Sequence, residues 1–275
     1  MAMAFDLGRW LGEVRDRRPL VHNMTNLVVT NPVANALLAI GASPVMAYAH
    51  EEVQDMARIS GALALNMGTL TSELVAGMLL AGKAAEEVHV PVVFDPVGVG
   101  ATPYRVQAAE EVTSNLHLTA LKGNAGEIGG MVGAGGRVSG VDSAAAGAGL
   151  TEAMVRYARD YQIVVVATGE KDFVTDGQHL WVLGNGHPLL ARITGSGCML
   201  TGIIGAFLAV AGKEGGPPAF AEACAAGITC FNIAAEKAGK GAPGPGTFAA
   251  RLFDELALLE PDETNRLARV ERHPV

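Results

Sequence analysis

The sequence predicts an α/β fold in which helices cover both faces of a mostly parallel sheet. Short apolar runs alternate with longer amphipathic segments along most of the 275 residues, which is the pattern of repeated β-α units. Several of these runs are continuously apolar, as expected of strands that are buried on both faces. No low-complexity linker or internal repeat interrupts the chain, so residues 1–275 are predicted to form a single domain.

The predicted strands are short and apolar, whereas the predicted helices carry an apolar period of about 3.6 residues. The strands are Leu20–His22, Ser43–Ala47, Ala62–Leu65, Val90–Phe94, Leu118–Lys122 and Ile163–Ala167. The helices are Ser72–Val88, Pro103–Asn115, Gly149–Tyr161, Met199–Ala211 and Pro218–Lys237. A β-hairpin is predicted over Asp172–Leu183, with Asp176 and Gly177 at its turn.

Composition excludes several classes of function. Hydrophobic residues make up 49% of the chain and charged residues 17%, which is ample material for a large core. The formal net charge of -8 argues against nucleic acid or an anionic membrane as a partner, because either would require a basic face. The most apolar run, Met199–Ala211, is shorter than the roughly 20 residues that span a bilayer, so it is predicted to be a buried helix.

The cysteines indicate the compartment. There are three of them, with no metal-ligand or disulfide spacing, and the first residues contain no apolar signal core. An odd number of free thiols is typical of a reducing environment. The sequence therefore predicts a soluble, cytoplasmic protein.

Polar residues and glycines follow five of the predicted strands at their carboxyl ends. Open α/β sheets bind ligands at this edge, so we expect these segments to form one composite site. The segments are 23–26, 66–69, 95–100, 123–127 and 168–170.

A further glycine-rich segment precedes the apolar helix Met199–Ala211. Gly195, Ser196 and Gly197 are followed by Cys198, and glycines allow a backbone to turn tightly and approach a ligand. The helix that follows would direct its unpaired N–H groups and its positive dipole end into this loop. The segment is therefore a candidate phosphate loop, although it contains neither a Walker-type lysine nor a dinucleotide fingerprint.

Two carboxylates and one cation lie in the strand-end segments. Taken singly, Asp95 is typical of a turn, Glu127 of a helix start and Lys122 of a protein surface. Together, the two carboxylates could bind Mg²⁺, which usually takes one or two carboxylates and substrate phosphate oxygens. Lys122 ends a predicted strand beside the same site, where a cation would meet phosphate.

Cys198 is the one cysteine in a position suited to chemistry, since Cys224 and Cys230 fit the apolar interior of a helix. A helix N-terminus lowers the pKa of a thiol, whereas a neighbouring triphosphate raises it. The sequence leaves open which effect prevails. It also leaves open a covalent role for the thiol, with His22 as the sole candidate base; a histidine hydrogen-bonded to a neighbouring loop is the alternative interpretation of His22.

Five segments in this order and spacing resemble the hydroxyethylthiazole kinase family. Each motif is weak alone, but together they are specific, and the resemblance covers roughly Leu20 to Glu255. The segments are His22–Asn26, Asn31–Tyr48, Leu65–Thr69, Asp95–Thr102 and Thr194–Cys198.

The resemblance implies a ribokinase-like three-layer sandwich and an ATP-dependent kinase. The reaction would transfer the γ-phosphate of ATP to the primary hydroxyl of 4-methyl-5-(2-hydroxyethyl)thiazole, giving the thiazole phosphate used in thiamine salvage. Members of the family are homotrimers with active sites between neighbouring subunits. The resemblance also implies contact with the thiazole for Met46, Gly195, Asn26 and Gly68, contact with ATP for Lys122 and Thr168, and binding of Mg²⁺ for Asp95 and Glu127.

The resemblance bears on two further points. Cys198 takes the place where related sugar kinases have a catalytic aspartate, so the expected task of its thiol is to handle the proton of the alcohol. Lys122 departs from the arginine that is common in the family; lysine keeps the charge but loses the bidentate fork.

Three alternatives remain at this point. The first is a kinase of the same fold for another small alcohol, such as a pyrimidine or pyridoxal-type ring. The second is acyl transfer with Cys198 as the nucleophile, which requires a base and an orienting group nearby. The third is a protein that binds nucleotide or thiazole without catalysis.

Overall fold

A nine-stranded sheet crosses the computed structural model, which describes residues 5–134 and 144–275. The strand order is β2-β1-β3-β4-β5-β6-β7-β8-β9; the pairs from β2 to β6 are parallel, and the pairs from β6 to β9 are antiparallel. The strands are β1 (Leu20–Met24), β2 (Ser43–Val45), β3 (Ala62–Asn66), β4 (Val92–Asp95), β5 (Ala120–Asn124), β6 (Val164–Thr168), β7 (Asp172–Thr175), β8 (His179–Leu183) and β9 (Val270–Pro274).

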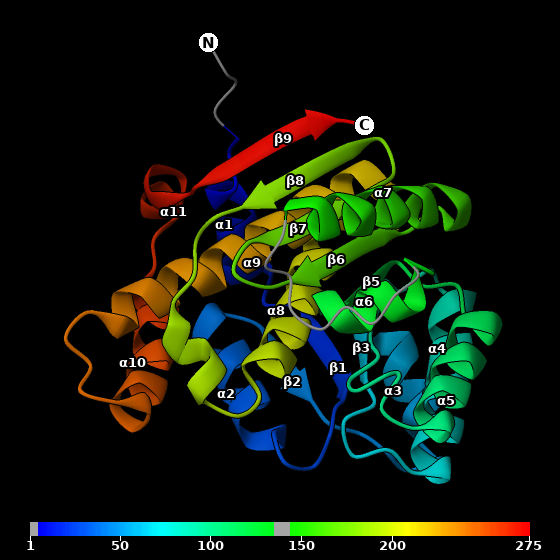
Figure 1. The fold of residues 1–275 in the computed structure, drawn as a ribbon. Helices are drawn as coiled ribbons and strands as arrows, with labels where there is room; N and C mark the ends of the chain where they lie inside the picture. The colour runs from blue at the N-terminus through cyan, green and yellow to red at the C-terminus, as the bar shows by residue number, and fades with distance from the viewer. Residues whose placement is uncertain (1–4, 135–143) are drawn as a thin grey trace.

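Helices cover both faces of this sheet, so the described fold has three layers (Figure 1). One core cluster packs α1, α2, α8, α9 and α10 on one face, and a second packs α3 to α7 on the other. The predicted α/β class with a mostly parallel sheet is confirmed. The helices are α1 (Gly8–Arg17), α2 (Thr30–Ile40), α3 (Val53–Ile59), α4 (Ser72–Glu87), α5 (Pro103–Asn115), α6 (Ala125–Met131), α7 (Ala144–Tyr161), the 3-10 helix η1 (Pro188–Arg192), α8 (Ser196–Ala211), α9 (Pro217–Gly239), α10 (Pro245–Leu258) and α11 (Pro261–Leu267).

The apolar strands owe their composition to burial on both faces. In β6, Val164 and Val166 belong to the first core cluster, whereas Val165 and Ala167 belong to the second. Side chains alternate between the faces of a strand, so a strand covered on both faces is continuously apolar.

The predicted strands coincide with observed strands, but five of them extend further at their carboxyl ends than the sequence predicts. β1, β3, β4, β5 and β6 each continue one or two residues further and take in polar residues. Asn66 of β3 is in register with Asp95 of β4, and Asn124 of β5 with Thr168 of β6. The ladder bonds use the backbone, so the sheet continues where the apolar pattern stops. These polar side chains are therefore held by the sheet.

At their other ends, three strands begin later than predicted. β4 begins at Val92 and β5 at Ala120, each two residues after the start of the apolar run, and β6 begins at Val164, one residue after it. The prediction for the second strand was too long, because β2 ends at Val45.

The predicted hairpin is confirmed: β7 and β8 pair antiparallel. At its turn, Gly177 has a φ of +82°, and Asp176 Oδ1 accepts a hydrogen bond from the N–H of Gln178 at 2.8 Å. β9 was not predicted, because four of its five residues are exposed and polar or proline, so it carries no apolar alternation.

The apolar C-terminal helices are core elements. α8 is buried almost throughout, as predicted for Met199–Ala211, but begins at Ser196. Among the described helices, α9 alone is long and apolar enough to cross a membrane, yet 78% of that window lies inside the fold. Cys224 and Cys230 of α9 are fully buried, as predicted.

Candidate functional site

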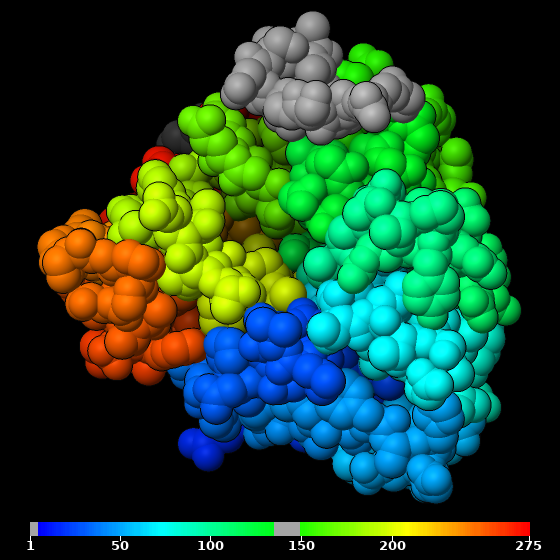
Figure 2. Space-filling view, turned by 60° about the horizontal axis from the view of Figure 1, so that its bottom comes forward, coloured from blue at the N-terminus to red at the C-terminus, as the bar shows by residue number. Residues whose placement is uncertain are grey.

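The candidate site lies where the carboxyl ends of the parallel strands meet the start of α8. Asn66 and Asp95 end β3 and β4, and Gly195 to Cys198 approach them from the α8 side. Lys122 was predicted to end its strand, but it lies in the middle of β5, because the ladder continues for two more residues. In Figure 2, which looks toward this edge, surface coloured blue, cyan, green and yellow borders a shallow hollow. The predicted convergence of the strand-end segments is thus observed for these residues.

One carboxylate oxygen of Asp95 accepts three hydrogen bonds within the site. Its Oδ2 accepts from Lys122 Nζ at 3.1 Å, from Asn66 Nδ2 at 3.0 Å and from the hydroxyl of Thr201 at 2.6 Å. The side chains of Asp95 and Lys122 are only 2% and 3% exposed. A buried charge pair of this kind is stable only when further hydrogen bonds satisfy it. Here the amide of Asn66 and the hydroxyl of Thr201 supply them.

Lys122 also binds the glycine loop. Its Nζ donates to the carbonyl of Gly197 at 2.9 Å. Gly195 is the N-cap of α8 with a φ of +82°, so Cys198 lies in the first turn of the helix. The ammonium therefore lies between the sheet and the loop, and two of its three N–H groups are used by the protein.

The thiol of Cys198 faces the same cluster. Its Sγ lies 3.3 Å from Asn26 Nδ2 and 3.3 Å from Asn66 Nδ2, each of which can donate to it. Burial, followed by the charge of Asp95, raises the pKa of this thiol, and the Lys122 charge and the two amides oppose that shift without cancelling it. The neutral thiol is therefore favoured, through burial and Asp95 rather than through either of the two effects, helix N-terminus and triphosphate, that were weighed from the sequence.

Asn66 connects the other members of the cluster. Its Oδ1 accepts from Asn26 Nδ2 at 3.0 Å and from the N–H of Gly68 at 3.1 Å. A Cβ on Gly68 would lie 2.6 Å from Asn26 Nδ2. The structure therefore brings together Asn26, Gly68 and Cys198, three of the predicted site residues.

Glu127 is held by backbone N–H groups. Its Oε1 accepts from Gly98 at 2.7 Å and its Oε2 from Asn124 at 2.8 Å, and with Asn124 it forms a capping box at the start of α6. The predicted helix-start position is confirmed. Its link to the segment that follows Asp95 is direct, through Gly98.

Two further predicted residues, Thr168 and Met46, make no hydrogen bond or ion pair to this cluster among the described residues. Thr168 ends β6, is partly buried and donates to the carbonyl of Gly123 at 3.3 Å. Met46 is partly buried, follows the end of β2 and packs against the core that includes α8.

A family model described as "Hydroxyethylthiazole kinase family" matches residues 11–262. Over 257 residues the chain is 50% identical to a protein named hydroxyethylthiazole kinase from Moorella thermoacetica, covering 94% of each chain. The chain belongs to the hydroxyethylthiazole kinase family. The predicted resemblance is therefore confirmed, and the class of enzyme is a phosphotransferase.

Solved structures agree with this family assignment and with the fold. A hydroxyethylthiazole kinase from Pyrococcus horikoshii superposes with a TM-score of 0.87 at 39% identity, covering 97% of this chain and 98% of that one. A ribokinase-like superfamily protein from Enterococcus faecalis superposes with a TM-score of 0.62 at 12% identity, covering 93% and 94%. The second match shows a shared fold alone, and it confirms the ribokinase-like architecture.

The described residues around Cys198 do not form the geometry that acyl transfer would require. His22 is fully buried, and its Nε2 lies 2.8 Å from the carbonyl of Ala47. Desolvation by burial lowers the pKa of this imidazole. The described neighbours of the Cys198 sulfur are amides rather than a base. The histidine thus binds a neighbouring loop, which was one of the two interpretations open from the sequence.

Sequence reasoning missed four polar residues around the site: Asn66, Arg105, Asp172 and Thr201. Asn66 lies inside a quoted motif but was given no role. Thr201 had a readable signal, since it lies one helical turn after Gly197 and so on the same side of α8. The sequence predicts Asp172 only as the first residue of the hairpin. Its partner, Asn232 of α9, is 60 residues away, so nothing nearby in the sequence indicates the contact.

Asp172 is buried, and its two oxygens accept from Gly169 N–H at 3.0 Å and Asn232 Nδ2 at 2.6 Å. Desolvation raises its pKa from 3.8 to about 6. The folded state therefore favours the neutral acid; this stabilisation is complete below the unfolded value of 3.8 and is lost as pH rises through 6. Between pH 4 and 7 we expect the free energy of unfolding to fall by up to about 3 kcal/mol on this account.

Urea unfolding across that pH range tests this expectation. The variant Asp172→Asn should lose the pH-dependent component, whereas Asp254→Asn, at an exposed position on α10, should keep it. Equal pH slopes for Asp172→Asn and the wild type would show that Asp172 does not titrate in this range.

Gly195 is required for two reasons. Its φ of +82° is left-handed, and a Cβ there would lie 2.5 Å from Val29 Cγ1. We expect Gly195→Ala to lower kcat/KM about 100-fold, because a displacement near 1 Å of a reacting loop has that effect. The matched control is Gly241→Ala, also left-handed at +74° but with no atom nearer than 4.0 Å. Steady-state kinetics should show near wild-type activity for the control; equal losses in both variants would assign the effect to backbone strain alone.

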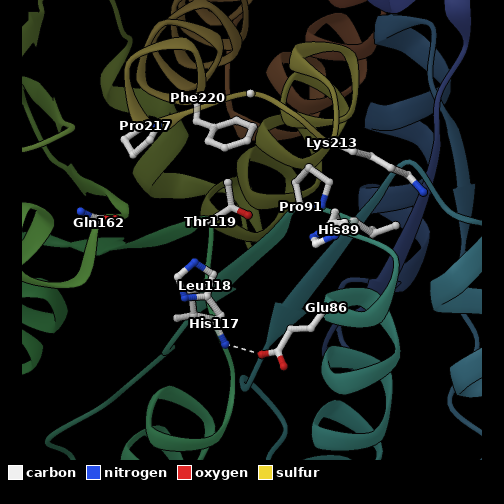
Figure 3. Close-up of a pocket in the computed structure, with 12 residues that line it drawn as sticks. Glu86, His89, Pro91, His117, Leu118, Thr119, Gln162, Lys213, Pro217 and Phe220 are labelled. Atoms are coloured by element: carbon white, nitrogen blue, oxygen red, sulfur yellow. Dashed lines mark hydrogen bonds between the residues drawn. The ribbon is translucent and has the colours of Figure 1, made fainter.

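Cavity size does not identify this site. A cavity of about 420 Å³ lies at the opposite edge of the sheet, near the amino ends of β4, β5 and β6 (Figure 3). The carboxylate of Glu86 accepts a hydrogen bond there from the N–H of His117, and the side chains of His89, His117 and Lys213 are exposed. Two cavities of about 330 and 220 Å³ flank the candidate site instead, the first lined partly by Thr194 and Met199 and the second partly by Thr25 and Thr69.

Proposed function

We propose that this chain transfers the γ-phosphate of ATP to the primary hydroxyl of 4-methyl-5-(2-hydroxyethyl)thiazole, giving the phosphate used in thiamine salvage. Family membership supports the reaction. The observation that carries it in this chain is the junction of Asp95, Lys122 and Cys198 at the first turn of α8. A thiol, a cation and a carboxylate meet there beside a glycine loop suited to an anion.

In this proposal, the glycine loop aligns and neutralises the transferring phosphoryl group. Phosphoryl transfer needs positioning and charge stabilisation more than covalent chemistry. The backbone N–H groups of Gly195, Ser196 and Gly197 start a helix, whose dipole favours the negative charge. The remaining N–H of Lys122 donates to phosphate, and Thr168 contacts ATP from the end of β6.

The carboxylates fit Mg²⁺. Asp95 Oδ1 accepts no hydrogen bond from the described residues, and each oxygen of Glu127 keeps a second lone pair beside its backbone N–H. These are hard oxygen donors of the kind that Mg²⁺ prefers, together with water and phosphate oxygens. Asp95 and Glu127 would hold the ion, which when bound neutralises charge on the phosphates.

Cys198 acts on the alcohol. Its neutral thiol lies between two amides, beside the loop that presents the phosphoryl group. In the proposed reaction the side chain orients the substrate hydroxyl, and its thiolate form, present once the thiol has lost its proton to solvent, accepts the proton of that hydroxyl. Met46, Gly195, Asn26 and Gly68 contact the thiazole.

We further propose a cytoplasmic homotrimer whose active sites lie between subunits. Directly after Asn26, the apolar side chains of Leu27 and Val28 are 73% and 66% exposed, which suits burial against a second subunit. Three free cysteines suit a reducing compartment.

A substrate panel tests the proposed function. ADP release should be fast with the thiazole alcohol and at least tenfold slower, at equal concentration, with pyridoxal or a hydroxymethylpyrimidine. Good turnover of either alternative alcohol and none of the thiazole would assign the chain to another substrate. Tight ATP binding with no phosphorylated product from any alcohol would make it a binding protein.

A further inference from the structure

Arg105 joins two loops of the site by donating to three backbone carbonyls. Its Nη1 donates to Met67 O at 2.8 Å and to Val97 O at 2.7 Å, and its Nη2 donates to Gly68 O at 2.7 Å. Hydrogen bonds from a charged donor are roughly twice as strong as neutral ones. The rigid guanidinium also fixes the relative position of its acceptors, which a lysine cannot do. The end of β3 with the loop that follows it (residues 66–69) is therefore fastened to the end of β4 with the loop that follows it (residues 95–100).

One peptide unit in the second loop is held from both ends. The carbonyl of Val97 accepts from Arg105, while the N–H of Gly98, in the same peptide plane, donates to Glu127 Oε1 at 2.7 Å. If this peptide plane were reversed, its carbonyl would face the carboxylate of Glu127 and its N–H would face the guanidinium of Arg105, and both contacts would be repulsive. The cation and the anion together thus select one orientation of this peptide, and the φ of +72° at Gly98 accommodates it.

The position of Arg105 in its helix indicates a role outside that helix. Thr102 caps α5 and accepts from the N–H of Arg105, so the guanidinium belongs to the first turn. A cation in the first turn is disfavoured by the helix dipole. The three carbonyl contacts compensate for this placement.

Both loops lead to the reacting groups. Gly68, whose carbonyl Arg105 holds, donates its own N–H to Asn66 Oδ1 at 3.1 Å. The amide of Asn66 reaches Cys198 and Asp95, each through a hydrogen bond. Three successive hydrogen bonds, through Gly68 and Asn66, thus connect Arg105 to the thiol and to the carboxylate.

We propose that Arg105 is a positioning residue for phosphoryl transfer, because its guanidinium aligns the 66–69 and 95–100 loops so that Asn66 and Asp95 meet Cys198. This inference rests on the proposed function of the site. It assigns Arg105 no contact with substrate. Loss of the side chain should disturb the two loops and leave the sheet and the helical layers intact.

Chemical rescue separates positioning from general stability. We expect Arg105→Ala to lower kcat/KM for the thiazole alcohol at least 100-fold, and millimolar guanidinium to restore at least tenfold, since the partly buried position can admit a small cation. Arg105→Lys should retain an intermediate activity. The control is Arg58→Gln on α3, whose guanidinium pairs only with exposed Asp55 and Glu87 among the described residues; its activity should be unchanged and insensitive to guanidinium.

Amide hydrogen exchange of the intact proteins supplies a second, activity-independent measurement. Exchange should accelerate at least tenfold in the 66–69 and 95–100 segments of Arg105→Ala and stay unchanged elsewhere. The inference is overturned if Arg105→Ala keeps a kcat/KM within twofold of wild type. It is also overturned if guanidinium does not rescue the activity and exchange is faster throughout the chain. If the wild type phosphorylates no alcohol, the proposed function fails, and exchange alone decides: acceleration confined to the two loops supports the positioning role, and unchanged exchange overturns it.

Discussion

Replacing Lys122 with Met is expected to lower kcat by about 10²–10³-fold. The ammonium is proposed to face the transferring phosphate, and removal of one preorganised donor typically costs about 10²–10³-fold. The variant also leaves Asp95 charged, 2% exposed and without its cation, which should destabilise the fold by about 3–5 kcal/mol. Rapid-quench or steady-state kinetics at saturating ATP measures the first effect, and urea unfolding the second.

A double variant separates the two effects. Lys122→Met with Asp95→Asn removes both charges, so stability should recover in part while activity stays lost. The control Lys83→Met removes an exposed ion pair with Glu86 and should change stability by less than about 1 kcal/mol. A Lys122→Met enzyme with kcat within tenfold of wild type would remove Lys122 from the proposed chemistry.

Replacing Cys198 with Ala is expected to lower kcat by about 10²–10⁴-fold with little change in KM for ATP, because a positioned base contributes that much. Cys198→Ser should lose less, since its hydroxyl can still orient the substrate. Burial and Asp95 raise the pKa of the thiol, so the thiolate fraction, and with it wild-type kcat, should increase as pH rises above neutrality.

The pH profile distinguishes a proton acceptor from a packing residue. Cys198→Ala should be flat over the range in which the wild type rises, at constant ATP and Mg²⁺. A Cys198→Ala enzyme that keeps full kcat, or that keeps the wild-type pH dependence, would show that the thiol does not handle the proton.

The sheet could be predicted from the sequence because burial on both faces leaves a direct record in composition. The strands β3 and β6 are continuous apolar runs, and the hairpin carries its turn residues. Their carboxyl ends could not be predicted from that pattern, because the ladder continues through Asn66 and Thr168 on backbone hydrogen bonds alone. The exposed edge strand β9 has no apolar face and so left no signal.

The site could be predicted as a set of residue types but not as a network. The motifs placed Asp95, Lys122 and Cys198 at one edge of the sheet. They could not show that Asn66 bridges the thiol and the carboxylate, because its partners are 29 and 132 residues away in the sequence. The pKa of Cys198 likewise depends on burial, which the local sequence does not reveal.

The central claim is that this chain phosphorylates the hydroxyl of the thiazole alcohol at the expense of ATP. Mass spectrometry of 4-methyl-5-(2-hydroxyethyl)thiazole after incubation with the purified protein tests it most directly, with ATP and Mg²⁺ each present or omitted. We expect a gain of one phosphoryl group that requires both and that is abolished in Lys122→Met. Unmodified thiazole under all conditions, in the presence of a folded wild-type protein that binds ATP, would contradict the claim.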